Sequence, residues 1–137
     1  MKRNERITKI MSADPITVNA THSILDVQKL MVDHSFHHVP VVSGKKLVGM
    51  ISATDLARAS YEFTDGQTHQ VMLDSTRTIA DVMQKGLVTI KETDTVRSAA
   101  QTLAKDWFHS LPVVDADENL VGIVTTTDLL NYLVDQF

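Results

Sequence analysis

The sequence contains no cysteine, which excludes disulfide bonds, thiolate metal sites and cysteine nucleophiles. It also lacks any apolar run near the roughly 20 residues that a membrane-spanning helix needs. No apolar run follows the charged residues 1–6, so we expect no secretory signal. The formal net charge is −4, and the basic face that nucleic-acid binding usually requires is missing. We therefore expect a cytoplasmic protein that binds neither membrane nor nucleic acid.

The rest of the composition is that of an ordinary globular protein, with 43% hydrophobic and 22% charged residues. A chain of 137 residues is long enough to bury a hydrophobic core without disulfides or metals. This length fits one compact domain or two very small lobes that share a core.

The chain contains two copies of one pattern. Met83 lies 72 residues after Met11, and after one extra loop residue Asp128 lies 73 residues after Asp55. The matched pairs keep their order along the chain: Phe36 with Phe108, His37 with His109, Pro40 with Pro112, Gly49 with Gly122, and Leu56 with Leu129. Two copies are too few for a solenoid, so we expect each copy to bury its apolar face on the other.

Each copy predicts the same elements in the order β-α-β-β-α, which is an α/β (α+β) fold. Ile24, Val27, Leu30 and Met31 follow helical spacing in the first copy. The continuous apolar runs 39–42 and 47–51 are typical of strands that are covered on both faces. Ser23 and Thr95 are expected to cap the first helix of their copies. We place the two units at residues 7–60 and 77–135, joined by a polar linker at residues 61–76.

The two copies resemble the CBS domain, named after cystathionine β-synthase, in the paired form called a Bateman module. Two motifs carry the resemblance in each copy. The first copy has His37-His38-Val39-Pro40-Val41-Val42 and then Gly49-Met50-Ile51-Ser52-Ala53-Thr54-Asp55. The second has His109-Ser110-Leu111-Pro112-Val113-Val114 and then Gly122-Ile123-Val124-Thr125-Thr126-Thr127-Asp128. The resemblance covers residues 7–135.

This resemblance implies two units packed through their sheets about a pseudo-two-fold axis, with two clefts between them. The clefts of such modules commonly bind adenosine derivatives, which makes AMP, ADP or ATP the expected ligand and leaves no obligatory cofactor. Such modules often form homodimers and regulate an attached or partner protein. Because no second domain is recognisable in the sequence, we expect a stand-alone module that acts on an unidentified effector protein.

The segments Ser52-x-x-Asp55 and Thr125-x-x-Asp128 have two compatible interpretations. One is a capping box, in which the hydroxyl and the acid satisfy the first amides of a helix. In the other, which the family resemblance implies, the aspartate accepts the ribose hydroxyls of a nucleotide. The hydroxyls and the free amides at the helix start are then able to face a phosphate.

Histidines 37, 38 and 109 raise the question of a metal. No carboxylate recurs nearby at ligand spacing, and adjacent residues on a strand point to opposite faces, so we predict no metal site. The resemblance instead brings His37 and the residue after it near a nucleotide phosphate. The second copy has Ser110 at that place and an acidic loop where the first has Lys45-Lys46. We therefore expect unequal sites, with the better phosphate site at Asp55.

Adenine needs an apolar slot with a few backbone hydrogen bonds, which Ile16, Thr17 and Val39 and their counterparts are able to supply, although plain core packing is the alternative. The predicted ligand-binding residues of the first copy are Ile16, Thr17, His37, His38, Val39, Pro40, Ser52, Thr54 and Asp55. Those of the second copy are Val88, Thr89, His109, Leu111, Pro112, Thr125, Thr127 and Asp128.

Enzymatic catalysis and scaffolding are the two other functions that the sequence allows. The sequence contains no Gly-rich phosphate loop and no recognisable set of nucleophile, base and orienting residue, so we expect no enzymatic activity. A scaffold that binds no ligand and only dimerises or docks a partner is the main alternative to a nucleotide sensor.

Overall fold

The computed structural model describes residues 4–64, 77–105 and 109–137. They form two compact units whose boundaries differ from those of the repeats. We call Ile16–Leu87 the Asp55 unit, and Met1–Pro15 together with Val88–Phe137 the Asp128 unit. The start of the chain therefore packs with the second repeat, and the segment that opens the second repeat packs with the first. Most of the predicted linker, residues 65–76, lies outside the described residues.

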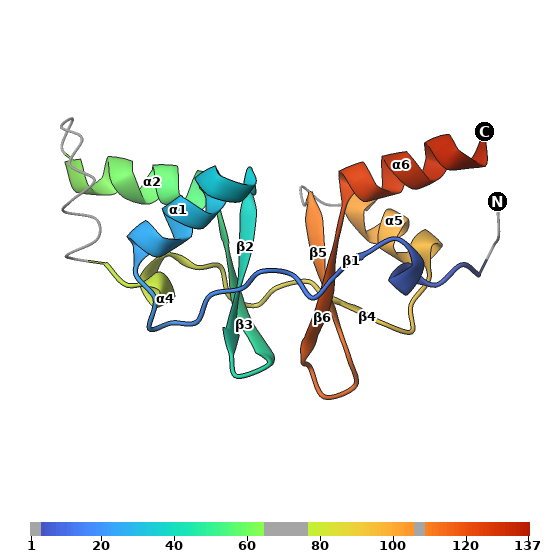
Figure 1. Cartoon of the computed structure of the whole chain (residues 1–137), viewed down its shortest axis with the longest axis horizontal. Coiled ribbons are helices and arrows are strands. Elements are labelled where there is room, and N and C mark those ends of the chain that lie inside the picture. Colours follow the sequence, from blue (N-terminus) through green and yellow to red (C-terminus); the bar gives the residue numbers. More distant parts are fainter. Residues whose placement is uncertain (1–3, 65–76, 106–108) are drawn as a thin grey trace. The chain divides into compact units, whose positions relative to one another are not determined.

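The Asp55 unit contains a two-stranded antiparallel hairpin, and its helices lie to one side of the hairpin (Figure 1). Its elements are α1 (Ile24–His34), β2 (His38–Ser43), β3 (Lys46–Ser52), α2 (Ala53–Thr64) and α4 (Ile79–Val82). The predicted first strand of this copy is reduced to a parallel bridge beside β2. There the Val18 amide donates to the Pro40 carbonyl at 3.0 Å, and the Val42 amide donates to the Val18 carbonyl at 2.8 Å.

The Asp128 unit repeats this plan with a four-stranded sheet in the order β1-β6-β5-β4. Its elements are the 3-10 helix η1 (Ile7–Lys9), β1 (Ser12–Ala13), β4 (Ile90–Lys91), α5 (Val96–Lys105), β5 (Ser110–Val114), β6 (Leu120–Thr125) and α6 (Thr126–Gln136). Strand β4 runs parallel to β5, while β1 and β5 run antiparallel to β6. The register of β5 on β6 is that of β2 on β3, and both ladders shift at the matched valines 41/42 and 113/114.

Helix starts are capped where the sequence predicts. The Ser23 hydroxyl accepts the Asp26 amide, and the Asp26 carboxylate accepts the Ser23 amide, which together form a capping box at α1. The Thr95 hydroxyl accepts the amide of Ser98 at 3.1 Å at the start of α5. These bonds satisfy amides that have no partner within the helix.

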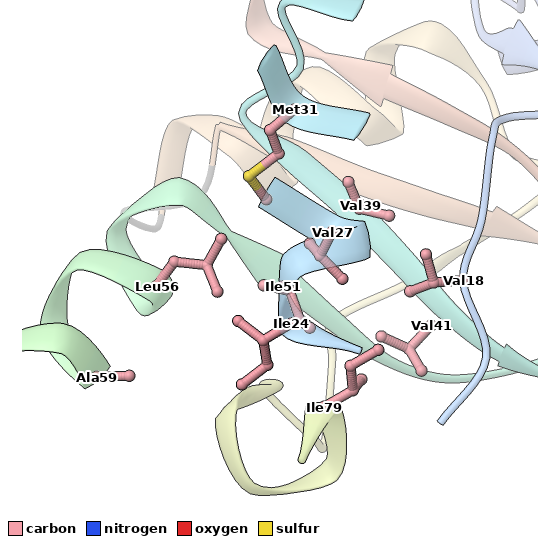
Figure 2. Close-up of a cluster of buried hydrophobic side chains, with 10 residues drawn as sticks. All are labelled: Val18, Ile24, Val27, Met31, Val39, Val41, Ile51, Leu56, Ala59 and Ile79. Carbon is pink, nitrogen blue, oxygen red and sulfur yellow. The ribbon is translucent and has the colours of Figure 1, made fainter. Parts of the chain in front are cut away.

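Each unit has its own hydrophobic core, and each core includes one isoleucine from the other repeat. Ile79 on α4 is fully buried in the core of the Asp55 unit, which Figure 2 shows in close-up. The remaining buried members of that core are Val18, Ile24, Val27, Met31, Val39, Val41, Ile51, Leu56 and Ala59. Ile7, the repeat counterpart of Ile79, is fully buried in the core of the Asp128 unit. The two short segments around these isoleucines therefore complete cores built mainly from the opposite repeat.

We call residues 7–13 and 79–84 the exchanged segments, because each packs with the opposite repeat. Their close approach explains why β3 and β6 each contain a glycine. A Cβ at Gly49 would lie 2.4 Å from the Met83 sulfur and 3.0 Å from the Gln84 carbonyl oxygen. A Cβ at Gly122 would lie 2.5 Å from the Met11 sulfur and 3.0 Å from the Ser12 carbonyl oxygen. Only glycine leaves room for these segments to cross the strands without a shift.

Candidate functional site

In the Asp55 unit the predicted ligand-binding residues gather at one end of the β2-β3 hairpin. His38 at the start of β2 lies opposite Ser52 at the end of β3, and the Ala53 amide donates to the His37 carbonyl at 2.9 Å. Residues 16 and 17 precede the bridge of Val18 to β2, so they approach the same end. The register therefore brings the backbone of the nine residues predicted for the first copy toward the same end of the hairpin.

The Asp128 unit places the second set in the same way. Ser110 lies opposite Thr125, and the Thr126 amide donates to the His109 carbonyl at 3.0 Å. Val88 and Thr89 precede β4, which pairs with β5 through Ile90 and Val113. Each predicted set thus belongs to a single compact unit.

The residues predicted to line an adenine slot differ in exposure. Ile16 and Val88 are 40% and 41% exposed, so both copies present an apolar side chain to solvent at the same place. Val39 and Leu111 are fully buried and belong to the cores. Pro40 and Pro112 are buried as well. A ligand that contacts these four positions would therefore do so through their backbones, and their role in binding remains a prediction.

Asp55 is a buried carboxylate at the start of α2, with only 7% of the residue exposed. Its Oδ2 accepts the Ser52 amide at 2.9 Å, while its own amide donates to the Ser52 hydroxyl at 3.0 Å. Its Oδ1 accepts the side-chain amide of Gln84 at 3.0 Å. The guanidinium of Arg58, largely exposed, lies 3.9 Å from the same oxygen, a distance at which an exposed ion pair contributes little.

Asp128 has the same cap but fewer neighbours. Its Oδ2 accepts the Thr125 amide at 2.8 Å, and its amide donates to the Thr125 hydroxyl at 3.1 Å. The residue is half-buried. Among the described residues, its Oδ1 has no hydrogen-bond or ion-pair partner. The capping box predicted for Ser52-Asp55 and Thr125-Asp128 is therefore present in both copies, and one carboxylate oxygen of Asp128 is left available.

His37, just before β2, is exposed, and His38, its first residue, is half-buried. Within the part of the chain that the structure describes, no three His, Asp or Glu side chains are grouped to hold a metal ion. Thr54 and Thr127 are exposed in the first turn of α2 and α6, beside the caps.

The loop charges do not lie where the sequence argument requires them. Lys45-Lys46 and the acidic loop 115–119 join the strands at the hairpin end opposite the caps (Figure 1). Six strand steps separate Lys46 from Ser52, roughly 20 Å at about 3.3 Å a residue. Glu118 in the acidic loop also pairs with Lys91 at 2.9 Å. The loop charges therefore lie too far from the caps to decide which of the two sets binds a phosphate better. The loop charges were thus a wrong basis for predicting unequal sites.

Sequence reasoning missed Gln84 as a neighbour of Asp55, and Ser12 as the matching residue of the other unit. The only signal in the sequence was the alignment of Met83 with Met11, which makes Gln84 and Ser12 equivalent positions of the two copies. That alignment alone does not reveal that the two segments exchange places between the repeats.

Known proteins share the repeats and the fold of this chain. The family model for the CBS domain matches residues 7–62 and 79–135. The chain is 31% identical over 132 residues to protein MJ1225 of Methanocaldococcus jannaschii, covering 94% of this chain and 47% of that protein. The structure of MJ1225 superposes with a TM-score of 0.84 at 30% identity, and the match covers 97% of this chain and 49% of that one.

Two solved structures are matched over nearly their full length. CBSX2, a CBS-pair protein from Arabidopsis thaliana solved with AMP, has a TM-score of 0.82 at 25% identity and covers 96% of this chain and 98% of its own. The CBS domain pair of protein MJ0100, solved with 5′-methylthioadenosine and S-adenosylmethionine, has a TM-score of 0.78 at 29% identity and covers 93% of this chain and 98% of its own.

The curated relatives are longer than the matched region. The chain spans 47% of the first and 23% and 22% of the next two, which carry enzyme names. None of the helices in the described residues is long and apolar enough to cross a bilayer. Because the family model covers both repeats, and CBS pairs share the fold, this chain belongs to the CBS domain family as a tandem pair.

Proposed function

We propose that this chain is a regulatory module without catalytic activity that binds an adenosine derivative such as AMP, ADP or ATP. The observation that carries the proposal is the doubled arrangement at the hairpin ends. In each unit a capped aspartate starts a helix, an exposed threonine follows the cap, and an exposed apolar side chain lies just before the segment that pairs with β2 or β5. The AMP bound by CBSX2 and the adenosine compounds bound by MJ0100 favour the same ligand class.

Each part of this arrangement suits one part of a nucleotide. A carboxylate accepts hydrogen bonds from the two ribose hydroxyls, which are donors. The hydroxyl of Thr54 or Thr127 lies at the start of a helix, where the positive end of the helix dipole favours a phosphate. Ile16 and Val88 offer apolar surface for the base. The expected ligand therefore contacts the carboxylate through its ribose. This arrangement does not specify how many phosphates the ligand carries.

A second candidate is the scaffold that binds a partner but no ligand. Helix α6 favours it, because no residue of this helix is buried. The apolar residues that it and the C-terminus expose are Leu130, Leu133, Val134 and Phe137. We propose a homodimer or an effector contact there, and a cytoplasmic setting, as parts of either function.

A thermal-shift panel over AMP, ADP, ATP, GTP, NAD and S-adenosylmethionine tests the sensor. A ligand at a hundredfold its Kd stabilises the native state by about 2.7 kcal/mol, which raises the Tm by about 5–10 °C in a chain of this size. We expect such a shift with at least one adenosine compound, reduced in Asp55→Ala or Asp128→Ala.

Asp26→Ala is the matched control, because Asp26 forms the same capping box on α1 outside both candidate sets. If it loses the shift as much as the other two variants do, the effect reports helix capping and not ligand contact. If no adenosine compound shifts the Tm while light scattering shows a stable dimer, the scaffold replaces the sensor.

A further inference from the structure

The carboxylate of Asp55 has an internal partner that the carboxylate of Asp128 lacks. The Gln84 side chain donates from Nε2 to Asp55 Oδ1 at 3.0 Å. An ionised carboxylate only accepts hydrogen bonds, so the amide must present its NH₂ group and not its oxygen. A ribose hydroxyl would approach that carboxylate with the same kind of donor.

The backbone holds Gln84 in this position. Its amide donates to the Met50 carbonyl at 2.8 Å, and its carbonyl accepts the Met50 amide at 3.1 Å. Met50 lies on β3 two residues before Ser52, the cap of α2. The side chain of Gln84 therefore starts from a fixed point next to the cap.

The matching point of the other unit holds a shorter side chain. Ser12 pairs with Ile123 on β6 as Gln84 pairs with Met50 on β3. No hydrogen bond joins Ser12 to Asp128 among the described residues. The position of Arg58, which flanks Asp55, is taken in the second copy by the uncharged Asn131.

From this difference we propose that Gln84 competes with the ribose for Asp55, so that the Asp128 site binds an adenosine ligand more tightly than the Asp55 site. This inference rests on the proposed function and names the residue that makes the two sites unequal. A ligand at Asp55 must displace or share the Gln84 amide on the carboxylate of a residue that is only 7% exposed. A ligand at Asp128 meets an oxygen without a competing donor.

Calorimetric titration with AMP tests the proposal on single sites. Asp128→Ala isolates the Asp55 site, and Asp55→Ala isolates the Asp128 site. In the Asp128→Ala background we expect Gln84→Ser to tighten AMP binding about fivefold, the effect of losing one competing hydrogen bond. In the Asp55→Ala background the reciprocal change Ser12→Gln should weaken AMP binding by a similar factor.

Two further variants separate competition from simple loss of structure. Gln84→Met keeps the length of the side chain but removes its donors, so it should tighten binding as Gln84→Ser does. Gln28→Ser, on α1 and outside both sets, should leave the Kd for AMP unchanged in the Asp128→Ala background. The Tm of each variant without ligand shows whether it is folded.

The outcomes distinguish this inference from the proposed function. Tighter binding in both Gln84 variants and weaker binding in Ser12→Gln support the competition. If AMP binds but the Gln84 variants leave the Kd unchanged or raise it, the competition is overturned while the sensor stands. If AMP and the other adenosine compounds bind no variant and not the wild type, the proposed function fails and this inference falls with it.

Discussion

At the scale of single residues, Gly49 and Gly122 show how closely the exchanged segments approach the strands. Each faces a methionine sulfur and a backbone oxygen that a Cβ would touch. At Gly49 the sulfur of Met83 can move, because a methionine side chain is flexible. The carbonyl of Gln84 is held more firmly, because the backbone of Gln84 is hydrogen-bonded to that of Met50. Shortening Met83 would therefore relieve the closest contacts at Gly49, while the backbone of Gln84 would remain as a second constraint.

Gly49→Ala is expected to lower the free energy of unfolding by about 1–3 kcal/mol, the usual cost of overpacking. The double variant Gly49→Ala with Met83→Ala should cost less than the sum of the two single variants, because the shortened side chain yields the space. Urea unfolding measures all three free energies. The same cycle on Gly122 and Met11 is the matched control, and strict additivity in both cycles would contradict the proposed crowding.

At the scale of elements, the helix caps link stability to pH. Hydrogen bonds from Ser23 lower the pKa of Asp26 below its ordinary value of 3.8, and those from Thr78 lower the pKa of Asp81 in the same way. Because both pKa values are lower in the folded protein than in the unfolded chain, the two ionised carboxylates stabilise the fold above pH 3.8. This stabilisation is lost as the pH falls through the folded pKa values.

We therefore expect the free energy of unfolding to fall as the pH drops below about 3.8, and to fall less steeply in the double variant Asp26→Asn with Asp81→Asn. Denaturant unfolding between pH 2 and pH 6 measures the slope. Asp33→Asn, near the end of α1 and away from its cap, serves as the control. A slope that the double variant leaves unchanged would show that other carboxylates carry the acid sensitivity.

Local sequence signals predicted the elements well but could not show to which compact unit the exchanged segments belong. Helical spacing identified α1, and the capping residues identified its start, because both depend on neighbours within a few positions. Ile7 and Ile79 lie in a single turn of helix each, and a turn so short has no periodicity that shows which core it enters. The same limit hid Gln84, which lies 29 residues from Asp55.

At the scale of the whole molecule, the compact units and the repeats divide the chain differently. Residues 16–87 contain α4 and Met83, which pack in the core of the Asp55 unit, and Gln84, which pairs with Met50 on β3. A fragment of residues 1–72 has the same length but lacks these contacts. It keeps residues 1–15, whose partners belong to the other unit.

We expect the 16–87 fragment to unfold cooperatively in urea and the 1–72 fragment to show no cooperative transition. Loss of a buried isoleucine alone typically costs about 2–5 kcal/mol, a large share of the stability of so small a domain. Circular dichroism during urea titration compares the two fragments at equal length. A cooperative transition in the 1–72 fragment would mean that the first repeat folds without the exchanged segment.

The exchange of segments has a consequence for the order of events during synthesis. The Asp55 unit has all of its parts once residue 87 has left the ribosome. Ile7 and β1, although translated before the Asp55 unit, have no partners until α5 and β6 have been made. The segment that contains Ile7 and β1 thus reaches its native place after the Asp55 unit, although it is made before that unit, and it stays unpaired while the Asp55 unit folds.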